Sequence, residues 1–296
     1  MLFRSTSYEQ PRALATVPVV ETSALPVRYR ATGRPRSASG QAACGHAAHG
    51  AIVQAVRLVQ AGRAAGLVTA PISKEHFAAA GVDFPGHTEL LAELCGGVPV
   101  RMMMVGGELR VVLVTIHLPL AQVPRRLSVD GVRETIMLTA QGLRRWFGVA
   151  APRIAVAGLN PHAGEHGLFG DEEARVITPA IRAARRRGLQ VSGPWAADGL
   201  FGQAAQGVRS AYDALVCMYH DQGLAPFKFV HFADGVNFTL GLPFVRTSPD
   251  HGTAFDIAGS GRADPRSMIA ALQVAAHAAS TQRGRLARVT SDVRCS

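Results

Sequence analysis

Three apolar segments of this sequence end in a histidine. The runs VVLVTIH, IAVAGLNPH and ALVCMYH end at His117, His162 and His220, and each run is typical of a buried strand. Ligands of open α/β sheets bind beyond the carboxyl ends of the strands, so the three imidazoles are expected to converge. A single histidine there is more often a hydrogen-bonded structural residue. Three in equivalent positions indicate a catalytic metal site, and neutral imidazole suits zinc, cobalt or nickel better than magnesium.

The use of lysine and asparagine points to the same segments. The chain has 31 basic residues, of which only Lys74 and Lys228 are lysine, and its only asparagines are Asn160 and Asn237. An ammonium is compact and can lose its proton, whereas a guanidinium is planar and keeps its charge. The composition therefore predicts that lysine stands where arginine would not serve.

A second set of residues suits an anion. Lys228, Asn237 and Arg246 are spaced nine residues apart, and a lysine and an arginine on either side of an amide match a phosphate or a carboxylate. The apolar FTLGLPFV between them favours a lined pocket over surface charge. In PGHTELL, His87 and Thr88 begin a predicted helix. A capping role explains Thr88, but no structural role explains His87.

Two glycine-containing segments could bring backbone close to a ligand. LNPHAGEHGLFGDEE joins a predicted strand to a predicted helix and includes Glu165, so its N–H groups could face an anion. SPDHGTAFDIAGSGRADPRSM is rich in small residues that permit close approach. No G-x-G-x-x-G follows a predicted strand, so the usual Rossmann dinucleotide site is not expected.

The elements that would position these residues alternate along the chain. Helical periodicity and breakers predict helices over 47–66, 87–96, 128–148 and 171–188, and apolar runs predict strands over 66–72, 109–117, 153–160 and 214–220. The first 40 residues are typical of weak strand and loop. The alternation predicts an α/β fold with mixed, largely parallel sheets.

Composition limits the class of protein. The 296 residues are 48% apolar and 18% charged, which is typical of a globular protein. Four cysteines (Cys44, Cys95, Cys217 and Cys295) form no C-x-x-C pair, and no 18-residue apolar run exists, so a reduced, cytoplasmic chain without a membrane partner is expected. An arginine-rich start is also compatible with a transit peptide. The net charge of +10 comes from scattered arginines without interleaved aromatics, which favours a solvated surface over nucleic-acid binding.

Seven motifs in order resemble one family. TAPISK, GHTE, TIHLPL, GLNPHAGE, MYHDQGLAPFK, GVNFTLGLPFVRTSPDHGTAFDIAG and ADPRSM, between about Ser39 and about Ser280, resemble the 4-hydroxythreonine-4-phosphate dehydrogenase family of pyridoxal phosphate synthesis. The resemblance implies a homodimer with two α/β domains, similar to isocitrate and isopropylmalate dehydrogenases, and an active site in the cleft between them. Residues 1–85 with 242–296 would form the nucleotide domain, and 86–241 the domain for metal, substrate and dimer contacts.

The resemblance also assigns residues. It implies one divalent ion (zinc, magnesium or cobalt) and NAD or NADP. The segment DHGTAFDIAG is similar to the HGSAPDIAG loop that holds adenosine in the related decarboxylating dehydrogenases. A helix N-cap is the alternative role for Asp256. The implied residues are His117, His162 and His220 for the metal; His87, Thr88, Lys228, Asn237 and Arg246 for the substrate; His251, Gly252, Asp256 and Gly259 for the cofactor; and Lys228, His220 and His162 for catalysis.

The implied reaction is oxidation of 4-phosphooxy-L-threonine at C3 by NAD(P), followed by loss of carbon dioxide to give 3-amino-2-oxopropyl phosphate. The metal would lower the pKa of the substrate oxygen. Intact GHTE and TLGLPFVRTSPDHGTA favour this substrate over that of paralogues, which oxidise threonate or erythronate 4-phosphate. Family members begin with a strand and a GDPAGIGPE-like loop that this sequence lacks, so an inactive ligand-binding scaffold is a further alternative.

Overall fold

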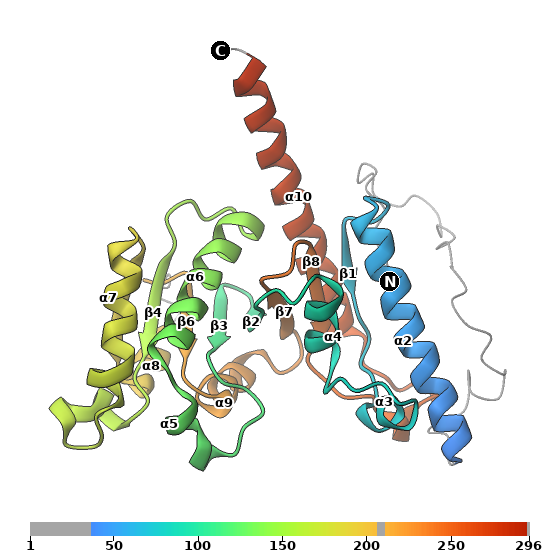
Figure 1. Ribbon diagram of the computed structural model, residues 1–296, viewed down its shortest axis with the longest axis horizontal. Helices are drawn as coiled ribbons and strands as arrows, with labels where there is room; N and C mark the ends of the chain where they lie inside the picture. The colour runs from blue at the N-terminus through green and yellow to red at the C-terminus, as the bar shows by residue number, and fades with distance from the viewer. Residues whose placement is uncertain (1–36, 206–210, 295–296) are drawn as a thin grey trace.

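The computed structural model describes residues 37–205 and 211–294, and its centre is one sheet of eight strands (Figure 1). The strand order is β1-β8-β7-β2-β3-β6-β4-β5. The strands are β1 (Gly66–Val68), β2 (Arg101–Gly106), β3 (Leu109–Leu113), β4 (Arg153–Ala157), β5 (Gln190–Trp195), β6 (Ala214–Cys217), β7 (Val236–Leu240) and β8 (Val245–Pro249). The predicted start of the chain and Cys295 lie outside the described residues.

The sheet is mixed. Strand β1 runs parallel to β8, and β3, β6, β4 and β5 form a parallel block. The antiparallel strands β7 and β2 join the two parts. The predicted fold class, α/β with mixed and largely parallel pairing, is confirmed, and each of the four predicted strand ranges contains a strand.

The described helices are α2 (Ala38–Gln60), α3 (Lys74–Ala79), α4 (His87–Leu94), α5 (Val123–Arg126), α6 (Val129–Trp146), α7 (Thr178–Arg186), α8 (Ala197–Ala205), α9 (His220–His231) and α10 (Arg266–Arg294). Short 3₁₀ turns are η1 (Leu120–Gln122), η2 (Pro161–Gly167) and η4 (Phe255–Ile257), and η3 (Glu173–Ile177) is a π-helical turn. The helix predicted over 171–188 is therefore η3 continued by α7. No helix in the described ranges is long and apolar enough to cross a membrane.

Helices cover both faces of the sheet. Alternate strand residues point to opposite faces. Val112 belongs to the buried cluster that contains residues of α6, α7 and α10, while its neighbour Leu113 belongs to the cluster that contains residues of α9. Helices α2 and α4 cover the end of the sheet that contains β1, and α8 covers β4 and β6 on the same side as α9. The result is a three-layer sandwich with apolar cores on both sides of the sheet.

Helix α6 illustrates how local sequence fixes this packing. Ser128 caps it by accepting a hydrogen bond from the Gly131 N–H at 3.0 Å. Ile136 and Leu143, seven residues apart on one face, are fully buried against the sheet. A side chain at Gly142 would collide with Leu240, so glycine lets the helix approach β7 closely.

The sheet crosses the proposed domain boundary. Strand β7 belongs to the 86–241 unit and β8 to the 242–296 unit, yet Asn237 pairs directly with Ser248 across the two strands. The division into two domains stays a prediction. For the site, the important point is that β3, β6 and β4 are parallel neighbours, so the segments that follow them leave the same edge of the sheet.

Candidate active site

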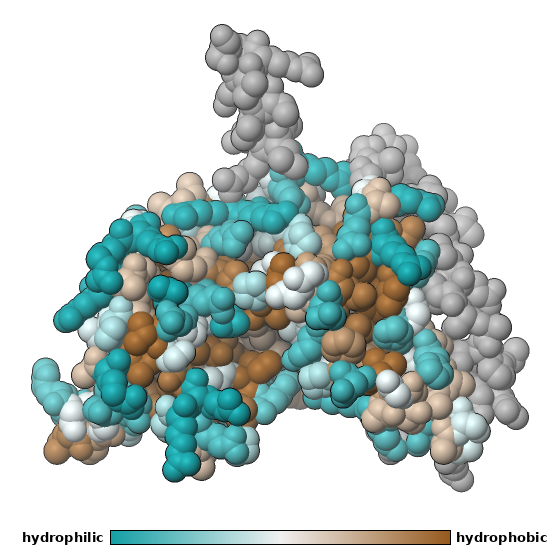
Figure 2. All heavy atoms as spheres, viewed as in Figure 1, coloured by the Kyte–Doolittle hydropathy of each residue, from teal (hydrophilic) through white to brown (hydrophobic). Residues whose placement is uncertain are grey.

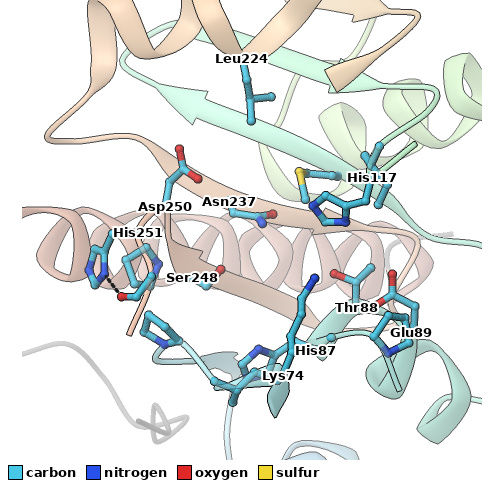
Figure 3. A pocket seen from close by; sticks show the side chains of 18 of the residues that line it. Lys74, His87, Thr88, Glu89, His117, Leu224, Asn237, Ser248, Asp250 and His251 are labelled. Carbon is cyan, nitrogen blue, oxygen red and sulfur yellow. Dashed lines mark hydrogen bonds between the residues drawn. The ribbon is translucent and has the colours of Figure 1, made fainter. Parts of the chain in front are cut away.

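One cavity of about 400 Å³ gathers most of the residues predicted to bind ligand. Its walls come from the segment after β1, the start of α4, the segment after β3, helix α9, and strands β7 and β8. Figure 3 shows Lys74, His117 and Asn237 reaching into the same space. Of the predicted site residues, the cavity is lined by His87, Thr88, His117, His220, Lys228, Asn237, Arg246, His251 and Gly252, and not by His162, Asp256 or Gly259.

Arg246 is a buried cation at the cavity wall. Its side chain lies on β8 with only 2% exposure, and its guanidinium donates to the hydroxyls of Thr239 at 3.0 Å and Thr69 at 2.7 Å. No carboxylate of the described residues lies within ion-pair distance of it, and its Nε has no hydrogen-bond partner there. Burial lowers the pKa of Arg246 to about 10, and the nearby Glu89 opposes this shift. The group stays charged at neutral pH and lacks the anion that normally accompanies a buried guanidinium.

Both lysines of the chain line the same cavity. Lys228, on α9, reaches Asp250 after β8, with 3.1 Å between Nζ and Oδ2. Lys74 is the first residue of α3, whose N-cap Ser73 accepts from the His76 N–H at 3.3 Å. The composition distinguishes Lys74 but predicts no site role for it, and the structure adds it to the cavity.

The start of α4 forms a further part of the wall. The N-cap of this helix is Gly86, without a side-chain capping bond, so the capping role predicted for Thr88 is wrong. Thr88 lies in the first turn and lines the cavity beside His87. Burial, and then the charge of Arg246, lower the pKa of His87 to about 3, so its imidazole is neutral in the working pH range. The first-turn N–H groups of a helix lack intrahelical acceptors and favour an anion.

Two carboxylates line the cavity that sequence analysis did not assign. Asp250 is paired with Lys228, as described above. Glu89, the third residue of α4, has no cation of the described chain within ion-pair distance. Its charge nevertheless opposes the lowering of the pKa of both Arg246 and His117 that burial causes. The motif GHTE contained Glu89, but no spacing rule distinguished it from an ordinary first-turn acid.

The structure brings two of the three predicted metal ligands together. The rings of His117 and His220 have centroids 5.9 Å apart. Burial chiefly lowers the pKa of His117, helped by the charges of Lys74 and His220 and opposed by Glu89, so the neutral form that binds metals is favoured. His220 begins α9, and its Nδ1 lies 2.6 Å from Oδ1 of Asp221.

His162 lies apart from this pair. It follows β4 in η2, outside the cavity, and its ring centroid is 6.1 Å from that of Phe169. Within the described ranges of the chain, no three histidine, cysteine, aspartate or glutamate side chains are placed to hold a metal ion. The residues present in one copy therefore fit part of a metal site, and the three-histidine assignment stays a prediction. None of the glycine-containing segment after β4 lines this cavity either.

Only the first part of the predicted nucleotide segment lines the cavity. His251 and Gly252 line it, with the His251 Nδ1 2.9 Å from the Gly252 carbonyl oxygen. Asp256 is exposed within η4, whose N-cap is Ala254 with a left-handed φ of 47°, so the N-capping alternative for Asp256 is wrong. The adjacent Phe255 stacks on His76 with centroids 5.4 Å apart, which attaches the segment to α3.

The fold is an α/β sandwich with a cavity beyond the ends of its strands, an arrangement typical of α/β enzymes. Three cations and four histidines line one concave space, as in enzymes that act on small anionic molecules. The chain belongs to the family of the pyridoxal phosphate biosynthetic protein PdxA, whose sequence model matches residues 3–275. The predicted family is thus confirmed, and the match begins upstream of the motifs that suggested it.

Individual relatives agree with the family. The 4-hydroxythreonine-4-phosphate dehydrogenase of Desulfosudis oleivorans is 59% identical over 225 residues, 76% of this chain and 66% of the relative. The protein of the same name from Geobacter metallireducens is 55% identical over 263 residues, 89% of this chain and 75% of the relative. A crystal structure of 4-hydroxythreonine-4-phosphate dehydrogenase from Klebsiella pneumoniae superimposes with a TM-score of 0.76 at 46% identity and covers 83% of this chain and 73% of that one.

Proposed function

We propose that this chain is a 4-hydroxythreonine-4-phosphate dehydrogenase, which oxidises 4-phosphooxy-L-threonine with NAD or NADP and decarboxylates the product. The observation that carries the proposal is Arg246, a buried guanidinium that has only hydroxyl partners and lines the cavity. A substrate anion supplies the missing negative charge. The family and its relatives support the identity of that anion.

Different cavity residues suit different groups of the substrate. Arg246, Lys228 and the first turn of α4 suit the phosphate and carboxylate groups, because charged donors and free N–H groups stabilise anions. His87 adds a neutral imidazole, which can hydrogen-bond without titrating near pH 7. Glu89 acts electrostatically on Arg246 but has no cation of the described residues within ion-pair distance, and the ammonium of an amino-acid substrate matches it. Threonate and erythronate phosphates carry no ammonium, so Glu89 favours the aminated substrate.

The implied cofactors would add two kinds of chemistry. NAD(P) would accept hydride, and a divalent ion held by His117, His220 and His162 would stabilise negative charge on oxygen. Lys228 and His220 both line the cavity from α9, where they can hold or move a proton at substrate oxygens. His251 and Gly252 lie at the same cavity and suit contact with the nucleotide, with Asp256 further along the segment.

A homodimer completes the proposal. Contiguous exposed apolar patches mark interaction surfaces. Phe229 is 92% and Phe232 82% exposed at the end of α9, and Leu168 beside η2 is 73% exposed. Figure 2 shows further apolar side chains at the surface beside α4 and between α5 and α6. A second copy covering α9 and η2 also offers a source for the third histidine, because His162 is apart from the other two within one chain.

Steady-state NADH and NADPH formation tests the proposal. Purified protein with a divalent metal is given 4-phosphooxy-L-threonine, threonate 4-phosphate or erythronate 4-phosphate, and ligand-induced shifts in melting temperature are recorded without nucleotide. Turnover of the first substrate, well above the others, is expected. Preference for a sugar-acid phosphate would favour the paralogous activity, and a melting shift without turnover of any substrate would favour the scaffold.

Replacing Lys228 by arginine is expected to leave a folded protein that loses at least roughly tenfold in kcat/KM, about 1.4 kcal/mol. The Lys228 ammonium fits between Asp250 and the cavity, whereas a guanidinium is bulkier, delocalised and unable to give up its proton. The kcat/KM of Lys228→Arg is measured together with that of a control, Arg186→Lys, which changes an exposed residue at the end of α7. Equal, near-normal values for both variants would remove Lys228 from the site.

Replacing Asp256 by alanine is expected to raise KM for the nucleotide several-fold with a smaller change in KM for the phosphorylated substrate. Asp256 is exposed, makes no capping bond and lies outside the cavity wall that would bind phosphate. Its loss should therefore leave the melting temperature nearly unchanged. Initial rates with each substrate varied separately measure both constants, and unchanged nucleotide KM would exclude Asp256 from the nucleotide site.

A further inference from the structure

A line of polar groups, two of them buried and one half-buried, connects the three segments that bear the candidate metal ligands. At the end of β3, Thr115 is 8% exposed and donates twice to the Met218 carbonyl, from its N–H at 3.2 Å and from its hydroxyl at 2.7 Å. Met218 directly follows β6 and is two residues from His220, while Thr115 is two residues from His117. These bonds set the spacing between the first two segments.

Gln222 connects the second segment to the third. It lies in the first turn of α9, and its side-chain oxygen accepts from the Met218 N–H at 2.7 Å. Its side-chain nitrogen donates to the carbonyl of Gly158, after β4, at 2.6 Å. Only a group that both donates and accepts can make this link, so neither a carboxylate nor an apolar side chain would replace the amide.

Glu173 fixes the third segment from the other side. The residue is 6% exposed, and its carboxylate accepts from the backbone N–H groups of Leu159 at 2.7 Å and Asn160 at 2.8 Å, and from the Asn160 side chain at 3.0 Å. A side chain at Gly158 would come within 2.9 Å of the carboxylate, and one at Gly164 within 2.7 Å. The carboxylate therefore lies between the two ends of the turn that contains His162.

That turn needs support because its backbone is strained. His162, Ala163, Glu165 and His166 all have left-handed φ values, between 41° and 57°. A non-glycine residue in this left-handed conformation costs roughly 1–2 kcal/mol of folding free energy. Strain of this kind persists only where surrounding contacts hold it, and Glu173 provides three hydrogen bonds at the entry to the turn.

We infer that Thr115, Gln222 and Glu173 form a strand-end brace, a set of positioning residues that fixes the segments of His117, His220 and His162 relative to the sheet. None of the three lines the cavity. Their role is to hold ligand-bearing backbone in place, as outer hydrogen-bond partners do in metal sites. The inference rests on the proposed function only for the metal-binding role of the histidines.

Glu173→Gln tests the brace, with Glu172→Gln as the matched control. Glutamine keeps one acceptor oxygen and adds an N–H₂ group that cannot accept, so one of the three bonds to residues 159–160 is lost. Glu172 is the adjacent carboxylate, and within residues 37–205 and 211–294 it accepts only from the Asn160 side chain, at 2.8 Å. Amide hydrogen exchange of the full-length protein should be at least about tenfold faster across residues 158–168 in Glu173→Gln and unchanged in Glu172→Gln.

Cobalt binding gives the functional measurement. Titration with Co²⁺, followed by its visible absorption, should show affinity lowered roughly 10–100-fold in Glu173→Gln, with an altered spectrum, and little change in Glu172→Gln. Gln222→Met, which loses both bridging bonds, should reproduce both effects if Glu173→Gln does not fold. Unchanged exchange in these variants would overturn the brace, and faster exchange with wild-type Co²⁺ affinity would overturn its positioning role. Absence of Co²⁺ binding by the unmodified protein would instead contradict the metal site of the proposed function, while exchange would still decide the brace.

Discussion

Arg246→Met is expected to give a folded protein that melts at a higher temperature than the unmodified chain yet loses at least roughly a hundredfold in kcat/KM, about 2.7 kcal/mol. The two effects have one cause. A buried guanidinium that contacts only the hydroxyls of Thr69 and Thr239 keeps its desolvation cost in the free protein. That cost is offset when a substrate anion binds, so removing the charge stabilises the free protein and weakens the complex.

Arg110→Met is the matched control. Arg110, on β3, is half-buried, and its guanidinium donates to the carbonyl oxygens of Glu108 and Asp213 and lies 4.8 Å from the Phe147 ring centroid. Its loss should lower the melting temperature and leave kcat/KM unchanged. Thermal unfolding and initial rates of both variants make the comparison. An Arg246→Met protein with normal substrate KM would refute the anion site, whatever its stability.

The central strands and most of the cavity could be predicted from sequence because each leaves a local signal. Strands β3 and β4 end in the apolar runs VVL and IAVA, and β6 is the apolar run ALVC, as expected for strands buried on both faces. The scarcity of lysine identified Lys74 and Lys228, and both line the cavity. This chain uses arginine for nearly all of its basic positions. A lysine in such a chain therefore indicates a position where the compact ammonium is needed.

Other elements left no such signal. Helix α9 contains Gly223 and Pro226, which are typical of a loop. The glycine is there because a side chain would collide with Val111 and Leu113, so close packing of α9 on β3 overrides propensity. The apolar run that contains β7 and β8 predicts a pocket lining and not two strands, since the short turn at Gly241 between them, with φ of 95°, gives no break in that run.

The position of His162 depends on a feature that periodicity does not encode. Four non-glycine residues of its turn adopt left-handed φ, a conformation that residue type alone disfavours. The buried carboxylate of Glu173 lies eleven residues downstream of His162, so the contacts that enforce this turn are not local. The sequence predicted correctly that a histidine follows β4, but the direction of the chain after β4 is set by tertiary contacts.

His117→Ala and His162→Ala, each purified alone, are expected to have no measurable turnover and reduced metal content, because loss of one of three protein ligands leaves a weak two-ligand site. A mixed dimer of one His117→Ala subunit and one His162→Ala subunit should regain activity. If His162 of one copy completes the site of another, a mixed dimer retains one site with all three histidines. Random assembly of equal amounts should then restore about a quarter of the unmodified activity, since half of the dimers are mixed and each has one intact site of two.

The mixed-dimer experiment separates the two ways of assembling the site. Co-expression with different affinity tags, followed by two-step purification, isolates the mixed dimer, which should show half the activity and half the metal content per dimer. If instead His162 joins His117 and His220 of its own chain through movement of η2, every site in the mixture lacks one ligand and no activity returns. A pairing of His117→Ala with His220→Ala is the control, because those rings lie 5.9 Å apart in one chain and cannot complement each other. Full metal content in His162→Ala alone would remove His162 from the metal site in either arrangement.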